Sequence, residues 1–162
     1  MYNLSMETDT NNTNKKSTWK SWVLGVVLGV GLAILGATGI IKDDNVNNTL
    51  IQIGASHTVT GAVELNPALA PAFAKAADII DAAIEARTTD PNTLVELVSA
   101  SLQEYTTTNV KPVVEAAVLY INQAHSVSEN EEHYHAKLRY LAAGFRSGAT
   151  LPDVEKDDAL DE

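Results

Sequence analysis

An uninterrupted apolar stretch near the N-terminus dominates the pattern of hydrophobic and polar positions. Residues 22–41, WVLGVVLGVGLAILGATGII, contain no charged side chain. Twenty helical residues at about 1.5 Å each extend about 30 Å, which is the thickness of the hydrocarbon layer of a bilayer. A helix also satisfies its own backbone hydrogen bonds in lipid. The pattern therefore predicts a transmembrane helix over residues 19–42.

Two other interpretations of this stretch compete with a retained membrane anchor. A cleaved signal peptide has a basic start like this one, but its apolar region is usually shorter, and Ala37-Thr38-Gly39 is the best small-residue cleavage site present. A helix buried in a protein core is the other alternative. The length of the stretch and its flanks favour the retained anchor.

The residues that flank the span predict its orientation. Indole rings favour the membrane interface, and basic residues favour the cytoplasmic side. Lys42 is the single basic residue just after the span, followed by two aspartates. The residues before and at its entry that suit an interface are Trp19, Trp22, Lys15, Lys16 and Lys20. We expect a cytoplasmic N-terminus and an extracytoplasmic C-terminal domain.

Small residues recur on one face of the predicted span. Gly25, Gly29, Ala33 and Gly36 are spaced by four, four and three residues, which places them along one side of a helix. Small residues let two helices approach closely in lipid, where packing drives association. They are therefore the candidate helix-packing residues of a homo-oligomer.

The segment 43–65 has a mixed pattern that admits several structures. It is uncharged from residue 46 to residue 63 but rich in Asn, Gln, Ser and Thr. It is predicted to be a linker or an amphipathic helix, and a helix or linker packed on the soluble domain is slightly preferred over one lying on the membrane surface. A second crossing is the remaining alternative, and it would return the C-terminal domain to the cytoplasm.

Helical periodicity governs residues 66–148, for which we predict a bundle of four helices. Asn66 is expected to cap the first helix and Asp90 the second, while Ser128 and Glu131 have capping-box spacing for the fourth. Short connections favour antiparallel packing, and a core of this size favours self-association. The four apolar stripes are Leu69, Phe73, Ala77, Ile80 and Ile84; Leu94, Leu97, Val98, Leu102 and Tyr105; Val110, Val113, Val114, Ala117, Val118 and Ile121; and Tyr134, Leu138, Leu141 and Phe145.

The overall prediction is an all-α protein with one N-terminal transmembrane helix followed by a small helical bundle. Residues 1–18 are polar and are expected to form a disordered arm, and residues 149–162 an acidic disordered tail. The formal net charge is −10, and residues 43–162 hold seven Lys and Arg against 19 Asp and Glu. This balance argues against a nucleic-acid partner. The absence of cysteine excludes disulfides, thiolate metal sites and cysteine nucleophiles.

Candidate chemistry is sparse. Glu129 with His133, and Glu131 with His135, have the spacing of side chains that share a helical face, but the two histidines lie about 200° apart and would not bind one metal ion. Ser56 and His57 are sequence neighbours, whose side chains point apart. We predict no catalytic residue, no cofactor-binding or metal site, and no enzymatic activity.

The stretch 15–62 resembles small phage membrane proteins of the holin type. The resemblance rests on the order KKSTWKSW, a Gly/Ala/Val span, a short polar turn and a weaker apolar segment. It implies a protein of the host inner membrane that oligomerises and permeabilises the bilayer. The alternative is a membrane-anchored helical interaction or scaffold module, whose bundle binds itself or a protein partner. In both cases the lipid bilayer is a partner.

Overall fold

The computed structural model describes residues 43–104 and 111–150. The predicted span 19–42, its interface residues, its small-residue face, the N-terminal arm and most of the acidic tail lie outside these ranges, as do Tyr105 and Val110.

The described part of the chain is all-α, as predicted. Its elements are α2 (Asp44–Leu65), the short 3-10 helix η2 (Pro67–Leu69), α3 (Ala70–Ala86), α4 (Pro91–Glu104), α5 (Lys111–Ser126) and α6 (Glu131–Ala149). None of these helices combines the length and the apolar character that a membrane crossing requires.

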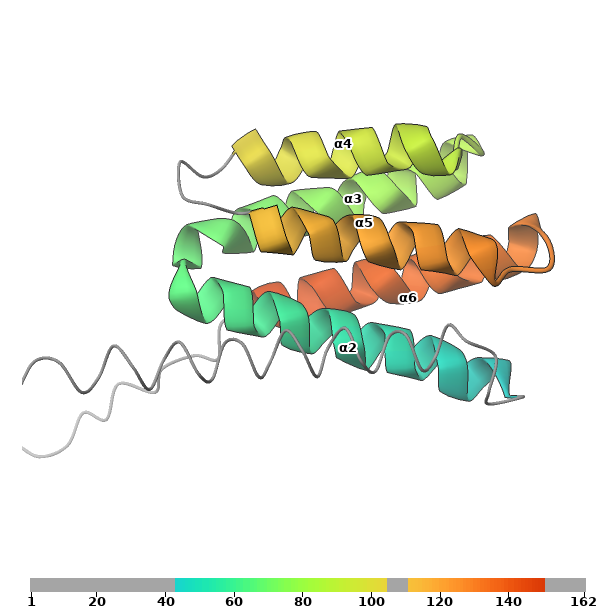
Figure 1. The fold of residues 1–162 in the computed structure, drawn as a ribbon, viewed down its shortest axis with the longest axis horizontal. Helices are drawn as coiled ribbons and strands as arrows, with labels where there is room; N and C mark the ends of the chain where they lie inside the picture. The colour runs from blue at the N-terminus through green and yellow to red at the C-terminus, as the bar shows by residue number, and fades with distance from the viewer. Residues whose placement is uncertain (1–42, 105–110, 151–162) are drawn as a thin grey trace, which may run out of the picture.

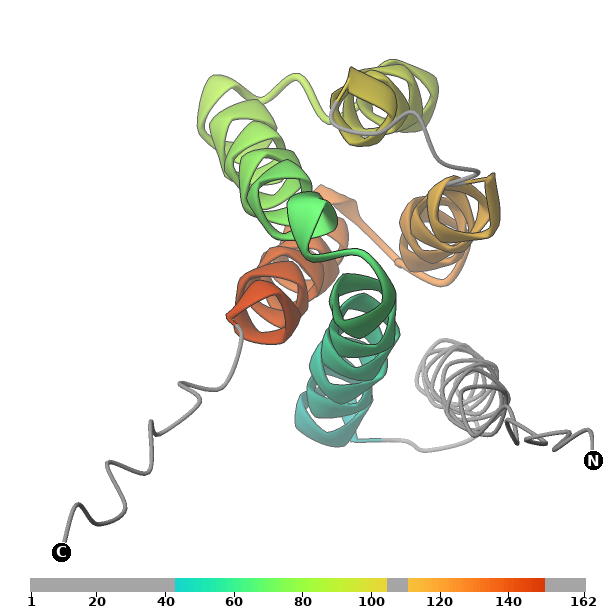
Figure 2. The same ribbon diagram turned by 90° about the vertical axis from the view of Figure 1, so that its left-hand side faces the viewer.

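Consecutive helices run in alternating directions, so that α2, α4 and α6 point one way and α3 and α5 the other (Figure 1). Viewed along the helices, α6 lies beside both α2 and α3, while α4 closes the far side between α3 and α5 (Figure 2). The α2–α6 contact is the most extensive in the described residues, and α3–α6 is the next. The segment 43–65 is therefore an integral helix of the bundle and not a linker outside it.

Side-chain caps determine where several helices begin. Asp43 accepts hydrogen bonds from the backbone of Asn45 and Val46, at 2.9 and 3.4 Å, and so starts α2 immediately after the predicted span. Asp90 caps α4 as predicted. Asn66 caps the short η2, whereas α3, the helix it was expected to cap, begins after Leu69 without a side-chain cap. The predicted Ser128 cap is wrong. Residue 130 supplies the cap of α6.

The cap of α6 shows why the capping-box spacing was misleading. Asn130 has extended backbone geometry, and its Oδ1 accepts a hydrogen bond of 2.9 Å from the backbone N–H of His133. The Ser128 hydroxyl instead donates to the carbonyl of Ala124, at the end of α5. Ser128 therefore completes the preceding helix and does not start the next one.

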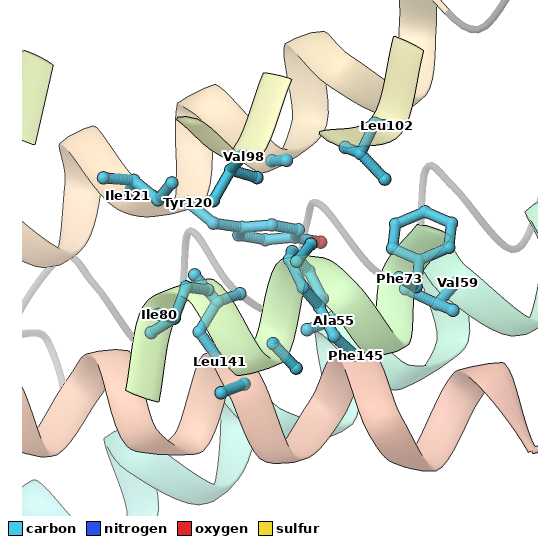
Figure 3. Packing of buried hydrophobic residues seen from close by; sticks show 14 of the residues in the cluster. Ala55, Val59, Phe73, Ile80, Val98, Leu102, Tyr120, Ile121, Leu141 and Phe145 are labelled. Carbon is cyan, nitrogen blue, oxygen red and sulfur yellow. The ribbon is translucent and has the colours of Figure 1, made fainter. Parts of the chain in front are cut away.

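The core combines the predicted stripes with a face of α2 that none of them included, formed by Ile51, Ala55, Val59, Ala62 and Val63. Phe73 and Phe145 meet edge to face with ring centroids 5.4 Å apart, and Tyr120 enters the same core from α5 (Figure 3). Leu97 is an exception, because its side chain is 49% exposed. Helix α4 contacts α3 and α5 at the edge of the bundle, so its buried face is narrower than the periodicity suggested.

Candidate functional site

The histidines singled out by their spacing lie at the start of α6, each paired with the expected glutamate. His133 Nδ1 lies 4.0 Å from Glu129 Oε2, and His135 Nε2 lies 3.5 Å from Glu131 Oε1. The His135 side chain is 13% exposed and its Nε2 is 2.8 Å from the hydroxyl of Thr89, whereas the His133 side chain is 40% exposed. The two rings thus have different surroundings, as their angular separation predicted.

No group of three metal-ligating side chains comes together within residues 43–104 and 111–150. Ser56 faces α6, with its hydroxyl 3.4 Å from that of Ser147, while His57 is exposed. The two neighbours therefore do not form a nucleophile and base.

A close helix–helix contact that the sequence reasoning missed joins α2 and α6. An added Cβ at Gly144 would lie 2.6 Å from the backbone oxygen of Gln52, and one at Gly148 would lie closer still to that of Ser56. Both distances are shorter than packing allows, so the two parallel helices touch through their backbones. Gly144 and Gly148 have GxxxG spacing, and this signal in the sequence marks the contact, which we call the α2–α6 seam.

A polar hollow of about 720 Å³ opens at the end of the bundle where α3 joins α4 and α5 joins α6. The start of α2 lies at the same end (Figure 1). We call this feature the polar hollow. Its lining is Arg87, Thr88, Thr89, Asp90, Pro91, His125, Ser126, Ser128, Asn130, Glu131 and Tyr134.

Tyr134 is the most unusual residue of the polar hollow. Its side chain is 4% exposed, and its hydroxyl has no hydrogen-bond partner among the described residues. Burial, together with the nearby Asp90 carboxylate, raises the pKa of Tyr134 to about 12, so the phenol keeps its proton near neutral pH. The ring of His125 packs edge to face on it, with centroids 5.2 Å apart. An unpartnered buried hydroxyl costs stability.

Arg87 follows α3 in a backbone conformation that normally favours glycine. Its φ is 53°, and the backbone bonds from Arg87 to Ile84 and from Thr88 to Ala83 form a Schellman motif. A left-handed conformation costs a side-chain-bearing residue about 1–2 kcal/mol. Arg87 also borders a second hollow, of about 520 Å³, with Glu132, His135 and Arg139. It makes no ion pair with any residue that the structure describes.

The two carboxylates of the polar hollow are already engaged by protein groups. Asp90 Oδ2 accepts hydrogen bonds from the backbone N–H and the hydroxyl of Thr93, at 2.9 and 3.0 Å, and these bonds hold the pKa of Asp90 below its ordinary value. Glu131 is 65% exposed and faces His135. The lining thus combines anchored carboxylates with a guanidinium and a phenol that lack protein acceptors.

Comparisons with known proteins found no matching family model, no matching curated protein and no matching solved structure.

Proposed function

We propose that the chain is a membrane-anchored helical binding module, with residues 19–42 as the anchor and the bundle as the binding body. The observation behind this proposal is the start of α2 at Asp44, capped by Asp43, directly after the predicted anchor. Because α2 is packed along α6, the bundle would be joined to the membrane without a long linker. In this function the bundle would act by binding a partner.

Topology provides the test. The natural chain has no cysteine, so a single Cys reports one position unambiguously. We would introduce Glu96→Cys, which is exposed on α4, and in a second variant Ser5→Cys, and label bacterial cells with a membrane-impermeant maleimide. The expected result is that Glu96→Cys is labelled in intact cells and Ser5→Cys is labelled after lysis. Release of the chain by alkaline carbonate would refute the anchor, and the opposite labelling pattern would refute the orientation.

A second candidate function, holin-like permeabilisation of the host inner membrane, is favoured by the small-residue face Gly25, Gly29, Ala33 and Gly36. In this function the anchor itself would oligomerise through close helix packing. Induced expression should collapse the membrane potential after a lag, and Gly29→Leu should prevent the collapse. The matched control is Leu28→Ile, which changes a large apolar residue beside this face. Continued growth with wild-type protein in the membrane fraction would leave the binding module as the function.

A further inference from the structure

The side of α2 that faces away from the bundle carries a row of apolar side chains. Val46 and Ile53 are 41% and 40% exposed, and Leu50 between them is half-buried. Their spacing of four and three residues places the three along one side of the helix. The core residues Ile51 and Ala55 lie on the opposite side, because two residues turn a helix by about 200°. We call Val46, Leu50 and Ile53 the outer stripe.

The charges around the outer stripe limit what can cover it. Helix α2 has no Asp, Glu, Lys or Arg between Asp44 and Glu64. The other described α-helices each have an exposed carboxylate, namely Asp78, Glu96, Glu115 and Glu132. In a chain with a net charge of −10, this side of α2 is thus an uncharged surface. It suits an apolar partner, since a charged partner would lose hydration there without gaining an ion pair.

The backbone at Asp43 determines how α2 follows the predicted anchor. Asp43 has extended dihedral angles, with φ −101° and ψ 110°, and its side chain caps α2. A single helix running through this position would need helical angles, so α2 does not continue the anchor straight out of the bilayer. Asp43 alone separates Lys42 from Asp44, and one residue extends at most about 3.6 Å. The first turn of α2, with Val46, is therefore held close to the end of the anchor.

We propose that the outer stripe lies on the lipid bilayer, so that α2 runs along the membrane interface with the rest of the bundle on its far side. This inference rests on the proposed membrane anchor. The sequence pattern presented packing on the bundle and lying on the membrane as alternatives for residues 43–65. In the structure, one side of α2 packs on the bundle while the outer stripe is left open to lipid.

The anchor is what makes so small an apolar surface sufficient. Helices that bind a membrane surface unaided usually add Lys and Arg, which attract anionic headgroups, and α2 has neither. The anchor would instead hold the outer stripe at a high local concentration of lipid. A second copy of the chain is a less suitable partner, because two acidic bundles would repel each other.

The test measures how close α2 is to lipid. The full chain, with one Cys carrying an environment-sensitive dye, is placed in phosphatidylcholine nanodiscs in which some lipids carry a nitroxide quencher near the headgroup. His57→Cys places the dye on the exposed side of α2, about 20 Å along the helix from Asp43, so an upright α2 would keep it out of reach. Leu97→Cys is the matched control, because it is exposed on α4, on the far side of the bundle from α2 (Figure 2).

If α2 lies in the interface, the nitroxide should quench the dye at position 57 roughly twofold or more beyond the dye at position 97. Equal quenching at the two positions would overturn the proposal. A dye at position 57 that is shielded from water but not quenched would show that protein covers the outer stripe, either a second copy or residues 22–41. That result would also overturn the bilayer as its partner.

Variants of the outer stripe identify the side chains responsible. Val46→Ser combined with Ile53→Ser should reduce quenching at position 57 to the level of position 97. The melting temperature should stay nearly unchanged, because both residues are exposed and serine has about their helix propensity. Leu97→Ser, which removes an equally exposed apolar side chain from α4, should leave quenching at position 57 unchanged. Full quenching in the double variant would refute the outer stripe as the contact.

Failure of the anchor is distinguishable from failure of this inference. Release of the chain by alkaline carbonate would refute the anchor and the inference together. A chain that stays in the membrane while the dye at position 57 is no more quenched than the control would refute the inference alone.

Discussion

The α2–α6 seam and the polar hollow are two regions of one bundle with opposite packing. At the seam, Gly144 and Gly148 bring two backbones into contact. The buried hydroxyls of Thr58 and Tyr120 each form a hydrogen bond. At the hollow, a buried phenol lacks a partner and Arg87 occupies a strained conformation. The difference indicates that the seam serves the stability of the fold, whereas the residues of the hollow are tolerated at a cost to it.

The largest effect should come from breaking the seam. Gly148→Ala places a Cβ against the backbone oxygen of Ser56, where a shift of a flexible side chain cannot relieve the clash. Overpacking of this kind costs about 1–3 kcal/mol, because α2 and α6 must move apart to make room for the Cβ. The higher helix propensity of alanine offsets about 1 kcal/mol of this cost. We expect a net loss of stability, measured as a lower melting temperature by far-UV circular dichroism.

The control for the seam is Ser147→Ala, which removes an exposed 3.4 Å hydroxyl contact with Ser56 but adds no atom against α2, and should leave the melting temperature nearly unchanged. A Gly148→Ala variant as stable as wild type would show that the two helices separate easily, and would remove the contrast with the hollow.

A smaller effect should follow when a satisfied hydroxyl is removed from the core. The Thr58 hydroxyl donates to the carbonyl of Gly54 at 2.9 Å, so the Tyr120 hydroxyl donates to Thr58, also at 2.9 Å. Tyr120→Phe should destabilise the protein by about 1 kcal/mol, the net contribution of one buried hydrogen bond. Tyr134→Phe, which removes an unpartnered hydroxyl, should not. Equal losses in chemical denaturation would mean that Tyr134 has a partner in solution that stabilises the fold.

Alkaline pH should destabilise the protein through two buried tyrosines, Tyr120 in the core and Tyr134 at the polar hollow. Burial raises the pKa of Tyr120 and of Tyr134 from 10.0 to about 12. Between these values the unfolded chain has lost phenolic protons that the folded chain still binds, so the free energy of unfolding falls as pH rises. Stability should be unaffected below about pH 10 and decline from there to about pH 12. Replacing either tyrosine with Phe should reduce this slope, as urea unfolding at pH 9 and pH 11 would measure; an unchanged slope in both variants would contradict it.

Most of the helical architecture followed from local patterns. The stripes containing Phe73 and Phe145 are buried as their periodicity predicted, and Asn66 and Asp90 start helices because their side chains satisfy backbone N–H groups nearby in sequence. Ser128 had equally good spacing and failed, because its hydroxyl had a closer acceptor at the end of α5. The capping residues thus predicted the position of the break between α5 and α6 to within a few residues. They did not predict which side chain caps which helix.

The α2 helix was harder to predict, because small and polar residues are interspersed among the apolar residues of its buried face. Gly54, Ala55 and Thr58 are buried there, and such a face looks too polar for a core and too uncharged for a surface. The polar hollow was missed for another reason. Its residues come from two connections that are close together because the helices alternate in direction, and no sequence spacing relates Arg87 to Tyr134.

The sequence by itself determined that the described chain is helical, where α4 begins and which side chains of most stripes face inward, because these depend on interactions within a few turns. The tertiary structure alone decided that α2 and α6 touch through their backbones, that Tyr134 is buried without a partner, and that Arg87 lines the same hollow. Those facts depend on the distance between helices and on which loops share an end of the bundle. Both are set by packing between segments far apart in the chain.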